Sequence, residues 1–301
     1  MFPQVIGFAT YPKCFALGFL LLVAFAAAEQ NASANAPSCQ PAGPLVRVPE
    51  LREGSGVAMS KRLPGRLWAH NDSGEPVLIA LDSSGAVVGR ILVSGANVED
   101  WEAIAVGPCA AGSCIFIGDI GDNDAERPSV TIYRIPEPAN TSGPAAVADA
   151  FHVTYPDGAH NAETLLVTPK GEILVVTKGD TGPVAVYRVP PDAKPGGMTT
   201  LQPVGKPRQT GKADARERMT DGAVSPSGQW VALRTNDALL FYRAEDLISG
   251  NWLPASRVSL KAVGEPQGEG LAFGDEKTIY LVSEGGRKSQ PGTFSRLTCA
   301  L

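Results

Sequence analysis

The sequence lacks an excess of positive charge. Its 26 lysine and arginine residues are outnumbered by 31 aspartate and glutamate residues, which gives a net charge of −5 with neutral histidines. Because binding to a phosphate backbone requires a basic surface, this balance gives no reason to expect a nucleic-acid partner. Hydrophobic residues make up 44% of the chain, too large a share for a disordered protein. The composition therefore predicts a globular protein that does not bind nucleic acid.

After residue 28 the sequence also lacks an apolar run long enough to cross a membrane. The long run lies at the start, where Lys13 precedes CFALGFLLLVAFAAA at residues 14–28. Its apolar core of about 14 residues is short for a bilayer span of about 20, and Ala26 and Ala28 form an A-x-A-like cleavage site. We interpret residues 1–28 as a cleaved signal peptide, with an uncleaved membrane anchor as the alternative, and residues 29–44 as a linker. The mature protein is then expected to be secreted or periplasmic, without a membrane partner, and monomeric.

Cysteine pairs at C-x2-C spacing are missing too, which disfavours a zinc site. In an exported protein an even number of cysteines indicates disulfides, and four cysteines remain after residue 28. Cys109 and Cys114 flank the short segment CAAGSC and can close a tight hairpin. Cys39 and Cys299 are left to join the two ends of the mature chain. A loop of that length would stabilise the fold by about 5 kcal/mol in the chain-entropy description.

Helical periodicity is almost absent, and AEDLIS at residues 244–249 is the best short helical candidate. Short runs rich in β-branched and aromatic residues dominate instead, such as VAVYRV, TIYRI and TIYLVS, each bounded by glycine, proline, asparagine or aspartate. Many short strands joined by regular turns are typical of a sandwich, a barrel or a propeller. The sequence therefore predicts an all-β fold.

Self-comparison decides among these folds. Five segments align beneath one another: GSGVAMS (54–60), DWEAIAV (100–106), NAETLLV (161–167), MTDGAVS (219–225) and QGEGLAF (267–273). A second apolar strand follows each segment, a third follows most of them, and a looser fourth follows four of them. The repeat spacing of roughly 45–60 residues is that of a propeller blade.

The fifth repeat ends after its third strand, while LVRVPEL, Leu45–Leu51, precedes the first repeat without a unit of its own. We expect this strand to pair in the last blade and close the ring, with Cys39 and Cys299 locking the seam. Residues 45–301 are thus predicted to form one β-propeller of five four-stranded blades. A six-bladed ring is the alternative, if the basic segment 205–218 contains strands.

Acidic side chains stand near the start of four of the five aligned segments. Because the first strand of each blade lines the central channel, Glu102, Glu163, Asp221 and Glu269 are expected to converge at its mouth. Two carboxylates 4 Å apart repel by about 4 kcal/mol at an effective dielectric of 20, so the cluster requires protonation, a lysine or arginine, or a bound cation. Ca²⁺ prefers oxygen ligands of this kind. Hydrogen bonds to backbone N–H groups between blades, and a metal-free acid pair in catalysis, are the alternatives to a metal site.

Loop residues at the same face extend this candidate site. In GDIGDND, Asp119, Asp122 and Asn123 are further candidate calcium ligands, although a tight turn capped by its own side chains explains the same pattern. We expect His70 or His160 to act as a general base or a ligand-binding group, with a simple turn as the alternative for HNDSG. Trp101 is expected to pack at the channel rim or to bind a ligand ring. The remaining candidate ligand-binding residues are Asn71, Asp72, Lys178, Arg234 and Glu284.

The motifs N-D-S-G, D-W-E-A-I-A and G-D-I-G-D-N, between Gly54 and about Pro138, resemble a group of exported bacterial β-propellers. More distantly, SGVA and GEGLAF resemble elements of the phytase-like ("esterase-like activity of phytase") and SdiA-regulated propellers, within the wider group that includes regucalcin-type lactonases. Calcium at the channel mouth is common in that group, which implies Glu102, Glu163, Asp221 and Glu269 as ligands. The cluster of lysines and arginines expected of a phytase is not evident in this sequence.

Three functions follow as hypotheses. The first is a propeller whose acidic channel mouth binds Ca²⁺ together with a small-molecule or protein ligand. The second is a metal-dependent hydrolase of esters, lactones or phosphoesters, in which Ca²⁺ polarises the scissile oxygen and a histidine moves the proton. The third is a metal-free structural or protein-binding propeller. The sequence contains no G-x-S-x-G, P-loop or H-E-x-x-H motif to add a more specific activity.

Overall fold

The structure is a computed structural model that describes residues 1–4, 7, 36–147, 149–287 and 290–301. Most of the predicted signal peptide, residues 5–6 and 8–28, lies outside the described residues. Among the residues described, none belongs to a helix with the length and apolar character of a membrane span.

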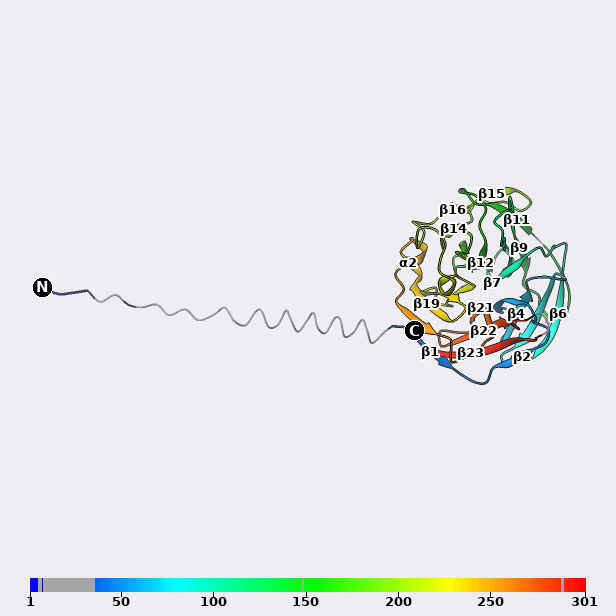
Figure 1. The fold of residues 1–301 in the computed structure, drawn as a ribbon, viewed down its shortest axis with the longest axis horizontal. Helices are drawn as coiled ribbons and strands as arrows, with labels where there is room; N and C mark the ends of the chain where they lie inside the picture. Colours follow the sequence, from blue (N-terminus) through cyan, green and yellow to red (C-terminus); the bar gives the residue numbers. More distant parts are fainter. Residues whose placement is uncertain (5–6, 8–35, 148, 288–289) are drawn as a thin grey trace. The chain divides into compact units, whose positions relative to one another are not determined.

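Five sheets are arranged around a central axis as the blades of a β-propeller, which confirms the predicted fold class (Figure 1). In each blade the strands follow one another antiparallel, so that the first strand lies near the axis and the fourth at the rim. Figure 1 shows β7, β12 and β21 close to the centre, and β6, β15 and β16 at the periphery. The inner strands are β3 (Gly54–Met59), β7 (Trp101–Cys109), β12 (Ala162–Val167), β17 (Asp221–Val224) and β21 (Gln267–Phe273).

The middle strands form the body of each blade. The second strands are β4 (Arg66–Asn71), β8 (Gly112–Asp119), β13 (Ile173–Thr177), β18 (Trp230–Thr235) and β22 (Thr278–Glu284). The third strands are β5 (Val77–Asp82), β9 (Val130–Pro136), β14 (Val186–Arg188), β19 (Ala238–Arg243) and β23 (Gly292–Ala300). In the first four blades the outer strands are β6 (Val87–Ser94), β11 (Asp149–Thr154), β16 (Gln202–Pro203) and β20 (Ser256–Ser259).

Two blades carry a fifth strand taken from the blade that follows them in the sequence. Strand β10 (Gly143–Ala146) pairs parallel with β6 at the outer edge of blade 1. Strand β15 (Met198–Thr200) pairs parallel with β11 at the outer edge of blade 2. Each borrowed strand therefore covers an edge and links two neighbouring blades.

Blade 5 is completed by the N-terminal part of the propeller. Strand β2 (Val46–Val48) pairs with the first half of β23, as the unpaired segment Leu45–Leu51 predicts. Strand β1 (Ser38–Pro41) pairs with the second half of β23, within residues that the sequence assigns to a linker. In that register Cys39 lies opposite Cys299, and the two form a disulfide. The predicted hairpin disulfide between Cys109 and Cys114 is also formed.

The basic segment 205–218 contains no strand, only the short 3-10 helix η1 (Ala215–Glu217). The six-bladed alternative is therefore wrong. The α-helix α2 (Ala244–Ile248) lies where AEDLIS predicts it, after the third strand of blade 4.

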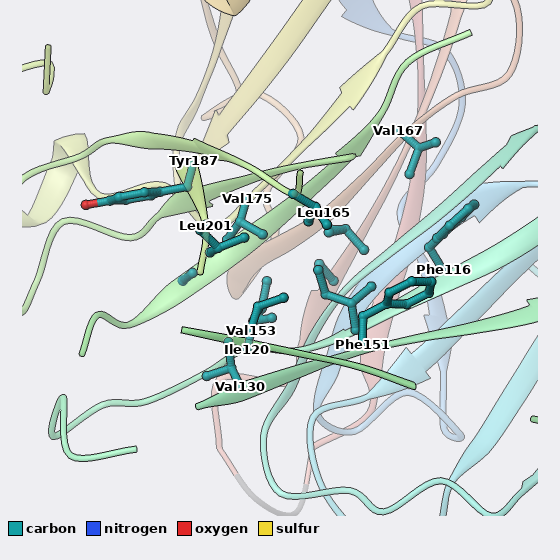
Figure 2. Packing of buried hydrophobic residues seen from close by; sticks show 14 of the residues in the cluster. Phe116, Ile120, Val130, Phe151, Val153, Leu165, Val167, Val175, Tyr187 and Leu201 are labelled. Carbon is teal, nitrogen blue, oxygen red and sulfur yellow. The ribbon is translucent and has the colours of Figure 1, made fainter. Parts of the chain in front are cut away.

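Among the described residues, the hydrophobic core is divided into five clusters, each between two neighbouring blades. Successive side chains of a strand point to opposite faces of the sheet, so Leu165 packs toward blade 2 whereas Leu166 packs toward blade 4. Figure 2 shows the cluster between blades 2 and 3, where Phe116 and Phe151 meet Leu165 and Val167. Both faces of every blade are buried in this way, which is why the strand sequences are apolar runs. The packing between blades holds the inner strands in place around the channel.

Candidate functional site

The inner strands share a local irregularity at the end where they begin. In blades 1, 2, 3 and 5 the pairing between the first and second strand shifts register there. The residues left out of pairing are Ser55, Glu102, Glu163 and, in blade 5, Glu269 with Gly270. A bulge of this kind redirects a side chain, so the three glutamates turn toward a common place at the channel mouth.

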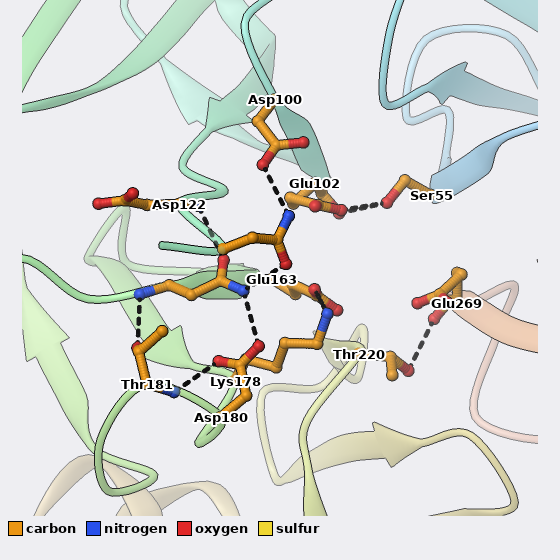
Figure 3. Close-up of polar contacts among 12 residues, drawn as sticks. Ser55, Asp100, Glu102, Asp122, Glu163, Lys178, Asp180, Thr181, Thr220 and Glu269 are labelled. Atoms are coloured by element: carbon orange, nitrogen blue, oxygen red, sulfur yellow. Dashed lines mark hydrogen bonds and ion pairs between the residues drawn. The ribbon is translucent and has the colours of Figure 1, made fainter. Parts of the chain in front are cut away.

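The three glutamates surround a single lysine (Figure 3). Lys178, which follows β13, forms an ion pair with Glu163. The charges of Glu102 and Glu269 act on the same ammonium group. Glu102 accepts a hydrogen bond from Ser55 Oγ at 2.6 Å, and Glu269 accepts one from Gln267 Nε2 at 3.0 Å. We call these four residues, Glu102, Glu163, Glu269 and Lys178, the glutamate–lysine cluster.

Burial controls the ionisation of this cluster. Burial, and then the charges of Glu163 and Asp100, raise the pKa of Glu102 well above its usual range. Burial and the charge of Glu269 likewise raise the pKa of Glu163, while Lys178 opposes the rise. Burial raises the pKa of Glu269 to about 8. Burial on its own would lower the pKa of Lys178, but the surrounding carboxylates outweigh it and raise that pKa. At neutral pH the lysine is therefore charged and Glu269 holds a proton.

Asp221 does not join the cluster, contrary to the prediction. It lies in register opposite Arg234, and its Oδ2 accepts a hydrogen bond from the backbone N–H of Leu271 at 2.7 Å, between blades 4 and 5. Thr220 takes the channel-side position in blade 4, where its Oγ1 donates to the carbonyl of Glu269 at 3.3 Å. Ser55 makes the equivalent bond to the carbonyl of Glu102 at 3.4 Å. Asp221 therefore follows the alternative interpretation, a buried acid that bonds backbone between blades.

Arg234 is also placed between blades, and not at a ligand surface. Its side chain has no exposed surface. Its guanidinium donates to the carbonyls of Gly270 at 2.5 Å and Val282 at 3.0 Å, and to Glu265 Oε2 at 2.6 Å. Through these bonds Arg234 links blade 4 to blade 5.

The loop GDIGDND uses its acids to hold its own backbone. Asp119 accepts hydrogen bonds from the backbone N–H groups of Glu99 at 3.3 Å and Asp100 at 3.1 Å, and pairs with Arg127 at 3.0 Å. Asp122 accepts hydrogen bonds from the backbone N–H groups of Glu126 and Arg127, both at 2.9 Å. This is the capped turn that the sequence leaves open as an alternative to calcium.

Asn123 belongs to a network of amide and carboxylate groups. Its Oδ1 accepts from Asn161 Nδ2 at 3.2 Å, and its own amide reaches Asp100 at 3.5 Å. Asn161 Nδ2 also donates to Asp180 at 3.0 Å. The network ties the loop after β8 to the loop after β13.

His70 and Trp101 lie inside the protein, in contact with each other. Both are 0% exposed, and their rings meet edge to face with centroids 5.7 Å apart. Burial lowers the pKa of His70 to about 4, and its Nδ1 lies 3.1 Å from the carbonyl of Asn71. Trp101 Nε1 donates to the carbonyl of Asn97 at 2.8 Å. Neither side chain is placed to touch a ligand at the channel mouth.

His160 belongs to a separate group. Its Nε2 lies 3.1 Å from Asp157 and 3.2 Å from the hydroxyl of Tyr187, and its ring packs edge to face on Tyr155. Its polar contacts are thus with Asp157 and Tyr187, whereas those of the glutamates are with Ser55, Lys178 and Gln267.

The N-D-S-G turn anchors the chain that enters blade 1. Asn71 accepts from the N–H of Glu53 at 3.1 Å and donates to the carbonyl of Glu50 at 2.9 Å. Burial, with the charges of Glu53 and Glu284, raises the pKa of Asp72 to about 7. Burial also raises the pKa of Glu284, and the charge of Lys178 opposes that rise. Asp72 and Glu284 therefore lie near the cluster and extend its acidic character.

The residues predicted to hold calcium do not come together as one ligand set. Asp119, Asp122 and Asp221 bond backbone N–H groups, and the remaining glutamates already act on the ammonium group of Lys178. Across residues 36–147, 149–287 and 290–301, no group of three histidine, cysteine, aspartate or glutamate side chains is arranged to hold a metal ion. The arrangement thus fits an internal lysine better than a calcium ion.

Sequence analysis missed Thr220 as a member of the ring, and within GSGVAMS it aligned Gly56 with the acids, with Ser55 as the alternative match. Both are small hydroxyl residues directly before the aligned acid or glycine. In blade 1 the residue left out of pairing is Ser55, one place before the aligned Gly56, whereas in blade 4 β17 pairs without a shift from Asp221 onward. A search for serine or threonine one place earlier in the blades without glutamate would have found them.

Comparison with known proteins places the fold but not the activity. A scan against protein-family models found no match, and a search of curated proteins found none either. Among solved structures, the PQQ-bound aldose sugar dehydrogenase from Streptomyces coelicolor is 14% identical over 88% of this chain and 99% of its own, with a TM-score of 0.53. The soluble aldose sugar dehydrogenase from Escherichia coli, in its apo-form, is 9% identical over 87% and 99%, with a TM-score of 0.48.

A gluconolactonase from Xanthomonas campestris is 11% identical over 86% of this chain and 95% of its own, with a TM-score of 0.41. The likeness to the Streptomyces enzyme agrees with the propeller fold described above. At such low identity it shows the fold alone.

Proposed function

We propose that the protein binds a small polyhydroxylated ligand at the mouth of its central channel, through the glutamate–lysine cluster. The observation that carries this proposal is the unused bonding capacity of three buried glutamates. Each accepts one side-chain hydrogen bond among the described residues, from Ser55, Lys178 or Gln267. An ionised carboxylate can accept about four hydrogen bonds.

Buried acids with a purely structural role are bonded more fully in this protein. Glu137, which is 1% exposed, accepts from Ser60, from Ser113 at 2.6 Å and from Trp68 Nε1 at 3.1 Å. The three glutamates of the cluster have no such set of partners, and a ligand would supply the missing ones.

The protonation of the cluster favours hydroxyl groups as the ligand chemistry. A protonated Glu269 donates a hydrogen bond, the Glu163 carboxylate accepts, and Lys178 donates from a positive charge. A hydroxyl both donates and accepts, so several hydroxyls on one carbon skeleton can use donors and acceptors together. Sugars and sugar lactones are the class that matches this mixture.

Calorimetric titration with neutral hexoses, pentoses and their lactones tests the proposal. We expect at least one of them to bind, and Glu102→Gln and Glu269→Gln to weaken it at least tenfold. Glu75→Gln, at an exposed glutamate of blade 1, is the matched control and should leave the affinity unchanged. If no sugar or lactone binds in the millimolar range, or if the cluster variants bind as tightly as the native chain, the proposal is wrong.

Calcium binding at this mouth stays a prediction that thermal unfolding can test. Because a bound ion stabilises the folded state, chelation would lower the melting temperature of a calcium protein. With Lys178 in the cluster we expect the same melting temperature in EDTA and in millimolar CaCl2. A clear rise with calcium that disappears in Asp122→Asn or Glu163→Gln would restore the predicted metal site.

A second candidate is a hydrolase of esters or lactones that works by acid–base chemistry at the same cluster. The specific observation in its favour is a carboxyl with a pKa of about 8, Glu269, near the Glu163–Lys178 pair. A proton donor of that pKa is suited to protonating a leaving oxygen near neutral pH. Turnover of chromogenic esters or lactones that disappears in Glu269→Gln would favour this candidate. Binding without turnover would indicate a binding protein. Absence of both binding and turnover would favour a protein-interaction propeller.

A further inference from the structure

The second half of the central channel encloses a cavity of about 220 Å³. All five inner strands line it, with side chains such as Met59, Ile104, Leu165, Val224 and Phe273. Apart from two glycines and the groups at its rim, the described lining residues are apolar. The cavity therefore differs in character from the acidic mouth of the same channel.

The cavity begins where the glutamate–lysine cluster ends. Ile104 and Leu165 lie two residues after Glu102 and Glu163 on the same strands. Two residues of a strand span roughly 7 Å. The cavity thus lies beyond the cluster along the inner strands, and its other end lies where these strands finish.

Lys61 stands at that other end and is the one charged residue among the described residues that line the cavity. No carboxylate lies within ion-pair distance of it in the described part of the chain. Burial lowers the pKa of Lys61, and the charge of Glu137 opposes this, but the oxygens of Glu137 already accept from Ser60, Ser113 and Trp68. Its ammonium group is therefore free to bind an anion.

The hydroxyls at the same rim are already engaged. Ser60 Oγ donates to Glu137, and Ser225 Oγ accepts from the backbone N–H of Trp230 at 3.2 Å. Specific recognition of a polar group at this rim consequently falls to Lys61.

We propose that this part of the channel binds a small amphiphilic carboxylate, with its hydrocarbon chain in the cavity and its carboxylate on Lys61. An apolar cavity of about 150 Å³ is enough for a benzene ring, so the space here suits a short alkyl chain or a single ring. Lys61 orients the ligand, because it is the charged side chain among the described residues of the lining and attracts the carboxylate. This site is separate from the proposed sugar site and uses none of its residues.

Calorimetric titration of the full chain with straight-chain carboxylates, from butanoate to octanoate, tests the hydrocarbon part. Burial of each added methylene should tighten binding about fourfold until the cavity is full. Affinity that does not depend on chain length, or no binding of any member, would overturn the proposal. This outcome is independent of whether sugars bind at the mouth.

The head group is tested with hexanoate and its neutral counterpart 1-hexanol. Lys61→Gln should weaken hexanoate about tenfold, as expected for the loss of one charge-assisted hydrogen bond, and leave 1-hexanol unchanged. Lys194→Gln, at an exposed lysine in the turn after blade 3's third strand, is the matched control and should change neither affinity. Equal binding of hexanoate by the native chain and Lys61→Gln contradicts the proposal.

Discussion

At the scale of single residues, the buried acids of this protein fall into two groups. Asp221 and Glu265 bind partners supplied by the fold itself, a backbone N–H and the Arg234 guanidinium. Glu102, Glu163 and Glu269 share one ammonium group and keep their carboxyls poorly bonded. A buried carboxyl without enough partners retains its proton, and this makes the stability of the protein depend on pH.

We predict that the free energy of unfolding falls as pH rises from about 4.5 to about 8. Burial raises the pKa of Glu269 from an ordinary 4.5 to about 8, so the unfolded chain releases this proton at lower pH than the folded one. Over that window the folded state holds more protons, and each retained proton costs about 1.4 kcal/mol per pH unit.

Urea unfolding at pH 5, 6, 7 and 8 measures this slope. Glu269→Gln should make the fall less steep, because its raised pKa is one of several in the cluster, whereas Glu75→Gln at an exposed position should leave the curve as it is. If the native chain had the same free energy of unfolding at pH 5 and pH 8, ionisation of the cluster would not destabilise the folded state, and the prediction would be wrong.

A second prediction concerns Arg234. Arg234→Met leaves Glu265, which is 3% exposed, without its cation, so we expect a loss of about 3–5 kcal/mol. Arg257→Met, which breaks the surface pair with Glu217, should cost at most about 1 kcal/mol. Urea midpoints of the two variants provide the comparison, and similar losses would contradict the assignment of Arg234 as a buried link between blades.

At the scale of elements, the register of the inner strands decides which side chain reaches the channel. The aligned segments predict Glu102, Glu163 and Glu269 correctly as neighbours, because their blades share the same irregularity. The same alignment places Asp221 wrongly, since β17 pairs without a shift. Such a shift arises from contacts between blades, and no pattern within one segment reveals it.

Close packing of inner strands sets the spacing of the cluster. A Cβ on Gly107 of β7 would lie 2.2 Å from Val167 Cγ1 of β12, and these strands carry Glu102 and Glu163. We predict that Gly107→Ala costs about 1–3 kcal/mol by overpacking and weakens ligand binding at the mouth.

Gly197→Ala is the matched control for this change. Gly197 lies in a turn away from the inner strands, and its Cβ would have Lys194 O as its nearest neighbour, at 3.3 Å. Thermal unfolding and sugar titration of both variants give the result. If Gly107→Ala were as stable as Gly197→Ala, the inner strands would have more freedom than the structure indicates.

At the scale of the whole molecule, the ring depends on its two ends meeting in blade 5. The Cys39–Cys299 disulfide closes a loop with a sequence separation of 260, whereas Cys109–Cys114 has a separation of 5. In the chain-entropy description these loops correspond to about 5 and about 2 kcal/mol. We predict that Cys39→Ser with Cys299→Ser lowers the free energy of unfolding at least twice as much as Cys109→Ser with Cys114→Ser. Equal losses in urea unfolding would mean that strand pairing alone closes the ring.

The ring could be predicted from the sequence because five similar segments, an unpaired strand and two terminal cysteines agree. The assignment of residues 29–44 to a linker was less successful, since SCQP has no strand pattern of its own and becomes β1 only beside β23. The loops His70–Asp72 and Asp119–Asn123 were expected to present side chains to a ligand. Asn71, Asp119 and Asp122 instead bond backbone groups, and the partners of Asn71 and Asp119 lie in other loops, 18–21 residues away in the sequence.

The fifth strands β10 and β15 protect the outer edge of the propeller on one side. They cover the outermost strands of blades 1 and 2, whereas in the described part of the chain β16 and β20 carry no strand beyond them. Backbone amides of β16 and β20 should therefore exchange with deuterium sooner than those of β6 and β11, and mass spectrometry of the native chain can follow this. Local opening of the propeller would then begin at the outer edges of blades 3 and 4, while blades 1 and 2 stay protected by their fifth strands.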